Sequence, residues 1–135
     1  MRRRGSFTLV AVDDKILLAA DADTGKSKKY SSAIPSGPGG AAGFIVAEAD
    51  NRASGHIVTI DVIKTARRSG VGSLLLQAAE DRLRSAGCRS VELETAVDNL
   101  SALSFYKRHA YNVIRTFPRY YSNGVDALVL QKDLD

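Results

Sequence analysis

A run of cations and glycines stands directly ahead of a leucine-rich segment. Residues 65–77 read TARRSGVGSLLLQ, in which Arg67, Arg68 and Ser69 precede Gly70, Val71, Gly72 and Ser73. Glycine lets a backbone approach a ligand closely, and a helix N-terminus with arginines beside it attracts phosphate groups. The segment is therefore either a plain helix start with solvated arginines or an anion site that suits a pyrophosphate.

A dinucleotide fingerprint is one reading of the same glycines. Glu92 and Glu94 lie about twenty residues further on, where such a site places its ribose-binding acid. Leu75, however, occupies the position of the third glycine, and the polar residues 64–69 separate Gly70 from the preceding strand. Because the fingerprint requires the strand to run directly into its first glycine, the sequence disfavours this reading.

Hydrophobic spacing predicts the helices and the strand that position these residues. Apolar residues recur at helical spacing over 71–86, and Gly87 stands where a glycine ends a helix. Residues 89–95 alternate apolar and polar side chains, so they predict a strand with Glu92 and Glu94 on one face. Asn99 is an expected N-cap for a second helix over 100–109.

The remaining apolar segments predict strands. They cover residues 7–12, 16–20, 43–48, 56–62, 111–115 and 127–134, with 43–48 and 56–62 read as an antiparallel hairpin. This element order predicts an α/β (α+β) fold with a mixed, mostly antiparallel sheet and helices packed on it. Residues 1–135 are expected to form one domain, in which the Gly-, Ser- and Pro-rich residues 21–42 are a flexible insertion.

Composition restricts the partners and the compartment. The chain has 135 residues, a net charge of +4 and one cysteine, Cys88, so it favours anionic partners and has no intrachain disulfide. No segment has the length and apolar character of a membrane span or signal-peptide core, and we expect a cytoplasmic protein. Neither His56 nor His109 has neighbours at metal-ligand spacing, so no metal site is expected.

Three segments together resemble the GNAT superfamily of N-acetyltransferases. Residues 67–72, RRSGVG, match its Arg/Gln-x-x-Gly-x-Gly/Ala signature, and VDNLSALSFYKRHAY resembles its Asn-x-x-Ala-x-x-x-Tyr-x-x-x-Gly-Phe segment. The tail YYSNGVDALVLQKDL is similar to the end of N-terminal acetyltransferases, including the ribosomal-protein alanine type. The resemblance spans residues 41–134, and it implies a GNAT fold and direct acetyl transfer from acetyl-CoA to a primary amine, with a peptide α-amine preferred.

The resemblance assigns a role to each candidate site residue. Glu94, aligned through Leu93 and Asn99, is the expected general base, with Glu92 a weaker candidate, and Tyr106 is the expected acid for the CoA thiolate. The acetyl-CoA contacts are expected from Ile60, Asp61, Val62, Arg67, Arg68, Ser69, Gly70, Val71, Gly72, Ser73, Asn99 and Tyr106. Tyr120 and Tyr121 are the expected peptide-binding residues.

Two departures from the family pattern leave alternatives open. Ala110 replaces the usual glycine before the aromatic residue, and the strand and two helices that usually precede Phe7 are almost absent. Those helices form one wall of the acceptor site, so that wall is expected from residues 21–42, from further sequence, or from a partner chain such as a second copy in a homodimer. A CoA-binding module without useful catalysis remains an alternative. A basic nucleic-acid-binding domain is another, although no aromatic-basic binding motif supports it.

Overall fold

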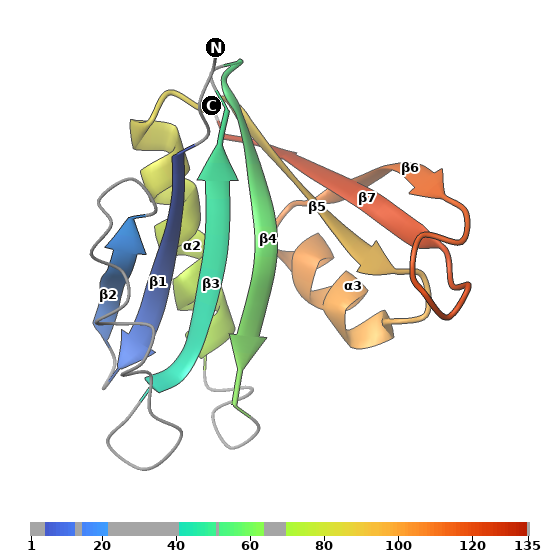
Figure 1. The fold of residues 1–135 in the computed structure, drawn as a ribbon, viewed down its shortest axis with the longest axis horizontal. Helices are drawn as coiled ribbons and strands as arrows, with labels where there is room; N and C mark the ends of the chain where they lie inside the picture. The colour runs from blue at the N-terminus through green and yellow to red at the C-terminus, as the bar shows by residue number, and fades with distance from the viewer. Residues whose placement is uncertain (1–4, 13–14, 22–40, 51, 64–69, 135) are drawn as a thin grey trace.

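A computed structural model of the chain describes residues 5–12, 15–21, 41–50, 52–63 and 70–134. In chain order the elements are β1 (Gly5–Val12), β2 (Lys15–Asp21), β3 (Ala41–Ala49), β4 (Ser54–Val62), α2 (Val71–Ser85), β5 (Ser90–Ala96), α3 (Leu100–Arg108), β6 (Asn112–Phe117) and β7 (Ala127–Asp133) (Figure 1). The insertion expected at 21–42 lies, apart from its ends, outside the described residues. The same holds for Arg67, Arg68 and Ser69.

The strands form one sheet in the order β2-β1-β3-β4-β5-β7-β6. All neighbouring strands are antiparallel except β4 and β5, which confirms the expected mixed, mostly antiparallel sheet. The parallel pairing of β4 with β5 ends after three residue pairs, the last of which joins His56 to Glu92. Beyond this point the two strands diverge, as Figure 1 shows. The sheet therefore opens in its middle rather than at an edge.

A β-bulge in β4 lies at the start of this opening. In the register with β3, Val46 pairs with Thr59 and Ala47 pairs with Ile57, which leaves Val58 as the extra residue. A bulge bends its strand and interrupts the regular ladder, and bulges are common beside active sites. The sequence pattern of this strand did not reveal the bulge.

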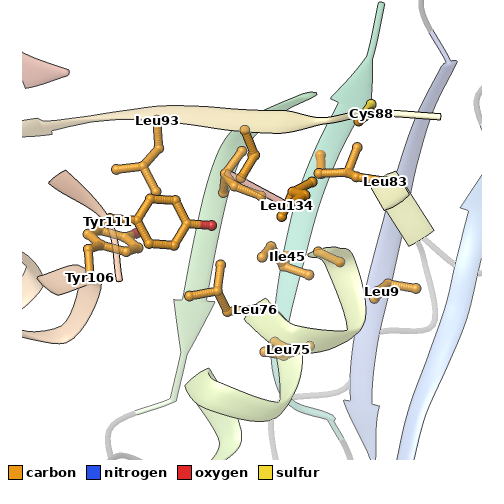
Figure 2. Close-up of a cluster of buried hydrophobic side chains, with 14 of the residues drawn as sticks. Leu9, Ile45, Leu75, Leu76, Leu83, Cys88, Leu93, Tyr106, Tyr111 and Leu134 are labelled. Atoms are coloured by element: carbon orange, nitrogen blue, oxygen red, sulfur yellow. The ribbon is translucent and has the colours of Figure 1, made fainter. Parts of the chain in front are cut away.

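The helices of the described residues, α2 and α3, pack on the same face of the sheet. Leu75, Leu76 and Leu83 from α2 share one buried cluster with Ile45 from β3 and Tyr106 from α3. Figure 2 shows these side chains converging between the helix and the strands. The alternation in β5 follows from this arrangement, because Val91 and Leu93 are buried there while Glu92 and Glu94 are on the opposite face. The expected division of that strand is confirmed.

A buried ionic cluster attaches α2 to the last strands. The Tyr111 hydroxyl donates to Oε2 of Glu80 at 2.8 Å, and Nζ of Lys132 lies 2.8 Å from Oε1 of the same carboxylate. Glu80 is 3% exposed, so both partners are needed to satisfy a charge that would be costly to bury alone. Burial and the Glu80 carboxylate both raise the pKa of Tyr111. The cluster fixes the position of α2 relative to β7.

The helix ends largely agree with the sequence. Gly87 has φ of 93° just beyond α2, as expected of a glycine that ends a helix. Asn99 is the N-cap of α3, because its side-chain oxygen accepts a hydrogen bond from the Ala102 N–H at 3.2 Å. Ala110 also has a positive φ, of 73°, although it carries a Cβ. The chain thus keeps a glycine conformation at the position where the family pattern has glycine.

Candidate active site

A cleft of about 1180 Å³ occupies the opening between β4 and β5. Its walls come from the second half of β4, the first turn of α2, the second half of β5 and one side of α3, and Tyr121 closes part of it. The cleft exists because β4 and β5 stop pairing after His56. Residues more than 60 positions apart in the sequence, such as Ile57 and Tyr121, therefore line one space.

The N-terminus of α2 faces this cleft. Gly70, Gly72 and Ser73 line it, and the N-cap residue Gly70 offers no side-chain cap to the first turn. Gly70 has φ of 90°, a left-handed conformation that favours glycine. A Cβ at Gly72 would lie 3.3 Å from Cζ of Phe105, so the helix and α3 approach closely there. The conformation of Gly70 and the close approach at Gly72 both favour glycine. The first backbone N–H groups of α2, which have no partner within a helix, therefore belong to residues at the wall of the cleft.

Ser73 also connects the first turn of α2 to the end of α3. Its Oγ lies 2.8 Å from Nε2 of His109, the C-cap residue of α3. The His109 ring also packs on Phe105, with ring centroids 4.8 Å apart. Burial is the main reason that the pKa of His109 is lowered. The neutral ring thus helps to hold α3 against the glycines.

Glu94 lines the cleft from β5, and Glu92 does not. Oε1 of Glu94 lies 2.8 Å from Nε2 of His56. Glu92 instead binds Arg115 at 3.4 Å and Gln131 at 3.3 Å. Although both carboxylates share one strand face, the structure brings Glu94 to the cleft and leaves Glu92, the weaker base candidate, outside its lining.

Tyr106 lines the cleft from α3 and is 7% exposed. Burial, with a smaller contribution from Tyr121, raises the pKa of the Tyr106 phenol to about 12. The Tyr106 ring packs edge-on against Tyr111 at 5.7 Å (Figure 2). The phenol therefore stays protonated near neutral pH and is available as a hydrogen-bond or proton donor.

The two tyrosines after β6 occupy different environments. Tyr121 lines the cleft, and burial, the Tyr120 hydroxyl and the Glu94 carboxylate all raise its pKa. Tyr120 is 52% exposed and packs edge-on against Tyr121 at 5.0 Å. The structure therefore places Tyr121 beside Glu94 and leaves Tyr120 outside the cleft wall.

Some of the other expected cofactor residues line the cleft and some do not. Ile60, Val62 and Asn99 line the cleft, whereas Asp61 and Val71 are absent from its lining. Asp61 pairs with Phe44 of β3 and is exposed. Its backbone still belongs to the cleft-side segment of β4, and Val71 still belongs to the first turn of α2.

The sequence alone did not single out His56 as part of this site. It lies on β4 between two carboxylates, with Nδ1 3.4 Å from Oε2 of Glu48 and Nε2 beside Glu94. A single polar residue at the start of a predicted strand carries no sign of such partners. Glu48 is 8 positions earlier and Glu94 is 38 positions later, so only the strand order brings the three together.

Comparison with known proteins agrees with this geometry. Residues 13–111, well over half of the chain, match the model of the acetyltransferase (GNAT) family. The chain belongs to the GNAT acetyltransferase family. Within it, N-alpha-acetyltransferase 30 of Schizosaccharomyces pombe is 38% identical over 73 residues, which cover 54% of this chain and 49% of that protein. The chain thus spans about half the length of this relative.

Solved structures of similar proteins share the fold. Ard1 from Thermoplasma volcanium matches with a TM-score of 0.67 and 34% identity, over 70% of this chain and 64% of that one. The NatC complex, crystallised with a Gag peptide and CoA, matches with a TM-score of 0.65 and 27% identity, over 75% of this chain and 66% of that chain. Within the described ranges, neither helix has the length and apolar character needed to cross a bilayer.

Proposed function

We propose that the chain binds acetyl-CoA in the cleft and transfers the acetyl group directly to a primary amine, with a protein N-terminal α-amine as the acceptor. The observation that carries this proposal is the meeting of three features in one cleft. These are the start of α2, the Glu94 carboxylate and the Tyr106 phenol. The names of the relatives support the choice of acceptor, since they include N-alpha-acetyltransferases. A free, buried Cys88 fits a cytoplasmic location.

The first turn of α2 is suited to the pyrophosphate of acetyl-CoA. Gly70, Val71, Gly72 and Ser73 would offer backbone N–H groups at the positive end of the helix dipole. The first turn of α2 contains no acidic residue that would repel an anion. The preceding residues 67–69 would add two cations and a hydroxyl to the same site.

The cleft side of β4 is suited to the pantetheine arm. Between Ile57 and Ile60, the β5-facing backbone has no strand partner among the described residues, because β5 pairs only as far as His56. An amide-containing chain can hydrogen-bond to such an edge as another strand would. Ile60, Asp61 and Val62 would extend this contact, and Asn99 would meet the arm from the opposite wall.

Two side chains would handle the protons of the reaction. A protonated amine cannot attack a thioester, so Glu94 would accept a proton from the acceptor ammonium. The nitrogen lone pair then forms the C–N bond as the C–S bond breaks, and Tyr106 would donate its proton to the departing thiolate. The second proton of the amine, lost from the cationic nitrogen, would restore the Tyr106 phenol. The raised pKa of Tyr106 keeps the phenol protonated, so that it would be available as a hydrogen-bond or proton donor to the leaving sulfur. Tyr121 would contact the peptide beside Glu94, with Tyr120 further out.

An acetylation screen with calorimetry tests this proposal. The chain is incubated with acetyl-CoA and three acceptor groups, namely peptides with free N-termini, N-terminally blocked lysine peptides and small amines. We expect saturable acetyl-CoA binding and transfer mainly to the free N-termini. Binding without transfer to any acceptor would instead identify a CoA-binding module. The absence of binding heat at high micromolar protein would contradict the proposal altogether.

Glu94→Gln then tests the base, with Glu92→Gln as the matched control on the same strand. Loss of a general base lowers kcat by about 10²–10⁴-fold. The control removes a carboxylate that binds Arg115 and Gln131 outside the cleft, so it should leave kcat nearly unchanged. Equal kcat values for the two variants would contradict the role of Glu94.

A further inference from the structure

Two carboxylates hold one imidazole ring where β4 and β5 separate. Nε2 of His56 lies 2.8 Å from Oε1 of Glu94, and Nδ1 lies 3.4 Å from Oε2 of Glu48. Glu48 is directly opposite His56 in the register of β3 and β4, and His56 is in the last residue pair that joins β4 to β5. Three neighbouring strands therefore fix the ring beside the residue that lines the cleft.

The two contacts differ in strength. At 2.8 Å, the bond between the ring and Glu94 has the length of a strong charge-assisted hydrogen bond, whereas 3.4 Å is long for one. The side chains of His56, Glu48 and Glu94 are 35%, 21% and 23% exposed, so water screens them only in part. The ring is thus bound firmly to Glu94 and restrained more weakly by Glu48.

An unrestrained glutamate would be a poor base, because its carboxylate rotates among several staggered conformations. We propose that His56 is a positioning residue that holds Glu94 in its reactive orientation. This inference rests on the function proposed above. The Nε2–H of His56 donates to Oε1 of Glu94, and the other oxygen, Oε2, takes the proton of the acceptor ammonium. The N–H bond of the amine breaks, an O–H bond forms on Oε2, and His56 keeps its own protons.

Two other roles for His56 predict different behaviour. If the ring only packs between the strands, any small polar replacement should act alike. If the ring passes a proton from Glu94 to Glu48, every replacement without an ionisable ring should fail. A second hollow of about 270 Å³ reaches the ring from the side of Glu48 and Asp50, so a proton path to solvent is a real competitor.

The variants His56→Gln and His56→Asn separate the three roles. Glutamine can place its amide nitrogen near the position of Nε2 and so keep the bond to Glu94. Asparagine is shorter and reaches only the position of Nδ1, near Glu48. We expect His56→Gln to keep kcat within about threefold of the wild type. His56→Asn should lower kcat by about 10–100-fold, as expected when a reacting group is displaced by about 1 Å.

The KM for acetyl-CoA should stay the same in both variants, because neither touches the start of α2. Glu92→Gln is the control for removing a charge from the same face. In a Glu94→Gln background the effect of His56→Asn should disappear, because a positioning residue acts only through the group that it positions. Additive losses in that double variant would overturn the inference.

The remaining outcomes are also decisive. Equal losses in His56→Gln and His56→Asn would overturn positioning in favour of packing or proton passage. If the wild type is active and His56→Asn has the same kcat, this inference is overturned and the proposed function stands. A wild type that acetylates none of the amines would overturn both.

Discussion

Replacing Ala110 by glycine should stabilise the protein. Ala110 lies just after α3, is exposed, and has φ of 73°. For a residue with a Cβ, the left-handed conformation costs roughly 1–2 kcal/mol. Glycine removes that cost but adds unfolded-state freedom worth roughly 0.4–1 kcal/mol. The difference spans about 0–1.6 kcal/mol, with a central net gain of about 0.8 kcal/mol in the free energy of unfolding.

This gain corresponds to a rise in Tm of about 2–4 °C for a chain of this size. Thermal unfolding followed by circular dichroism, together with urea denaturation, measures it. Ala86→Gly is the matched control, because Ala86 is also an exposed alanine at a helix end but has φ of −83°. There glycine relieves nothing, so the control should lose stability. Ala53, with φ of 65°, should respond to glycine as Ala110 does.

A result in which Ala110→Gly and Ala86→Gly shift Tm in the same direction would refute the reasoning. It would mean that the backbone at residue 110 is not strained in solution. If Ala53→Gly raises Tm and Ala110→Gly does not, the energetic argument stands. The backbone conformation described for the turn after α3 would then be wrong. The hydrogen bonds from the N–H groups of Ala110 and Tyr111 to α3 would then need to differ from those described.

The other predictions concern the cleft and the core. Tyr106→Phe should lower kcat by at least about tenfold and acetyl-CoA affinity by less, and an unchanged kcat would exclude the proton-donor role. Because burial raises the pKa of Tyr106 to about 12, its phenol stays protonated above pH 10 in the folded state while the unfolded state ionises. Its contribution to the free energy of unfolding, about 2–3 kcal/mol, is therefore lost between about pH 10 and pH 12. In Tyr106→Phe, the free energy of unfolding should fall less steeply over this pH range than in the wild type. Gly72→Ala should weaken acetyl-CoA binding at least about tenfold in calorimetry, and unchanged affinity would contradict the proposed phosphate site. The free energy of unfolding should change by less than about 1 kcal/mol, because the higher helix propensity of alanine offsets its close contact with Phe105. Cys88 is 3% exposed, and burial raises the pKa of its thiol. Ellman's reagent should therefore label it at least about 100-fold faster in denaturant than in the folded state. Rapid labelling of the folded protein would contradict the burial of Cys88.

Local chemistry made much of the fold predictable. The helix over 71–85 follows from apolar spacing and from Gly87, whose positive φ ends it. Asn99 was predictable as an N-cap because its side chain acts within three residues of its own position. The two faces of β5 follow from alternation alone, and GNAT membership followed from short motifs around the glycines and Tyr106.

Long-range pairing decided what the pattern left open. Glu92 and Glu94 are equivalent by alternation, but the neighbouring strands give Arg115 and Gln131 to one and His56 to the other. The bulge at Val58 and the end of pairing after His56 depend on the register with β3 and β5. Tyr120 and Tyr121 are adjacent in sequence, yet only Tyr121 reaches the cleft.

By itself, the amino-acid sequence determined the elements, the family and the residue types that suit a thioester site, because each depends on neighbours a few positions away. The tertiary structure decided which of those residues share the cleft. Strand order and register are set by the packing of the sheet on α2 and α3. For this reason the contact between His56 and Glu94, across 38 positions, became visible only in the folded chain.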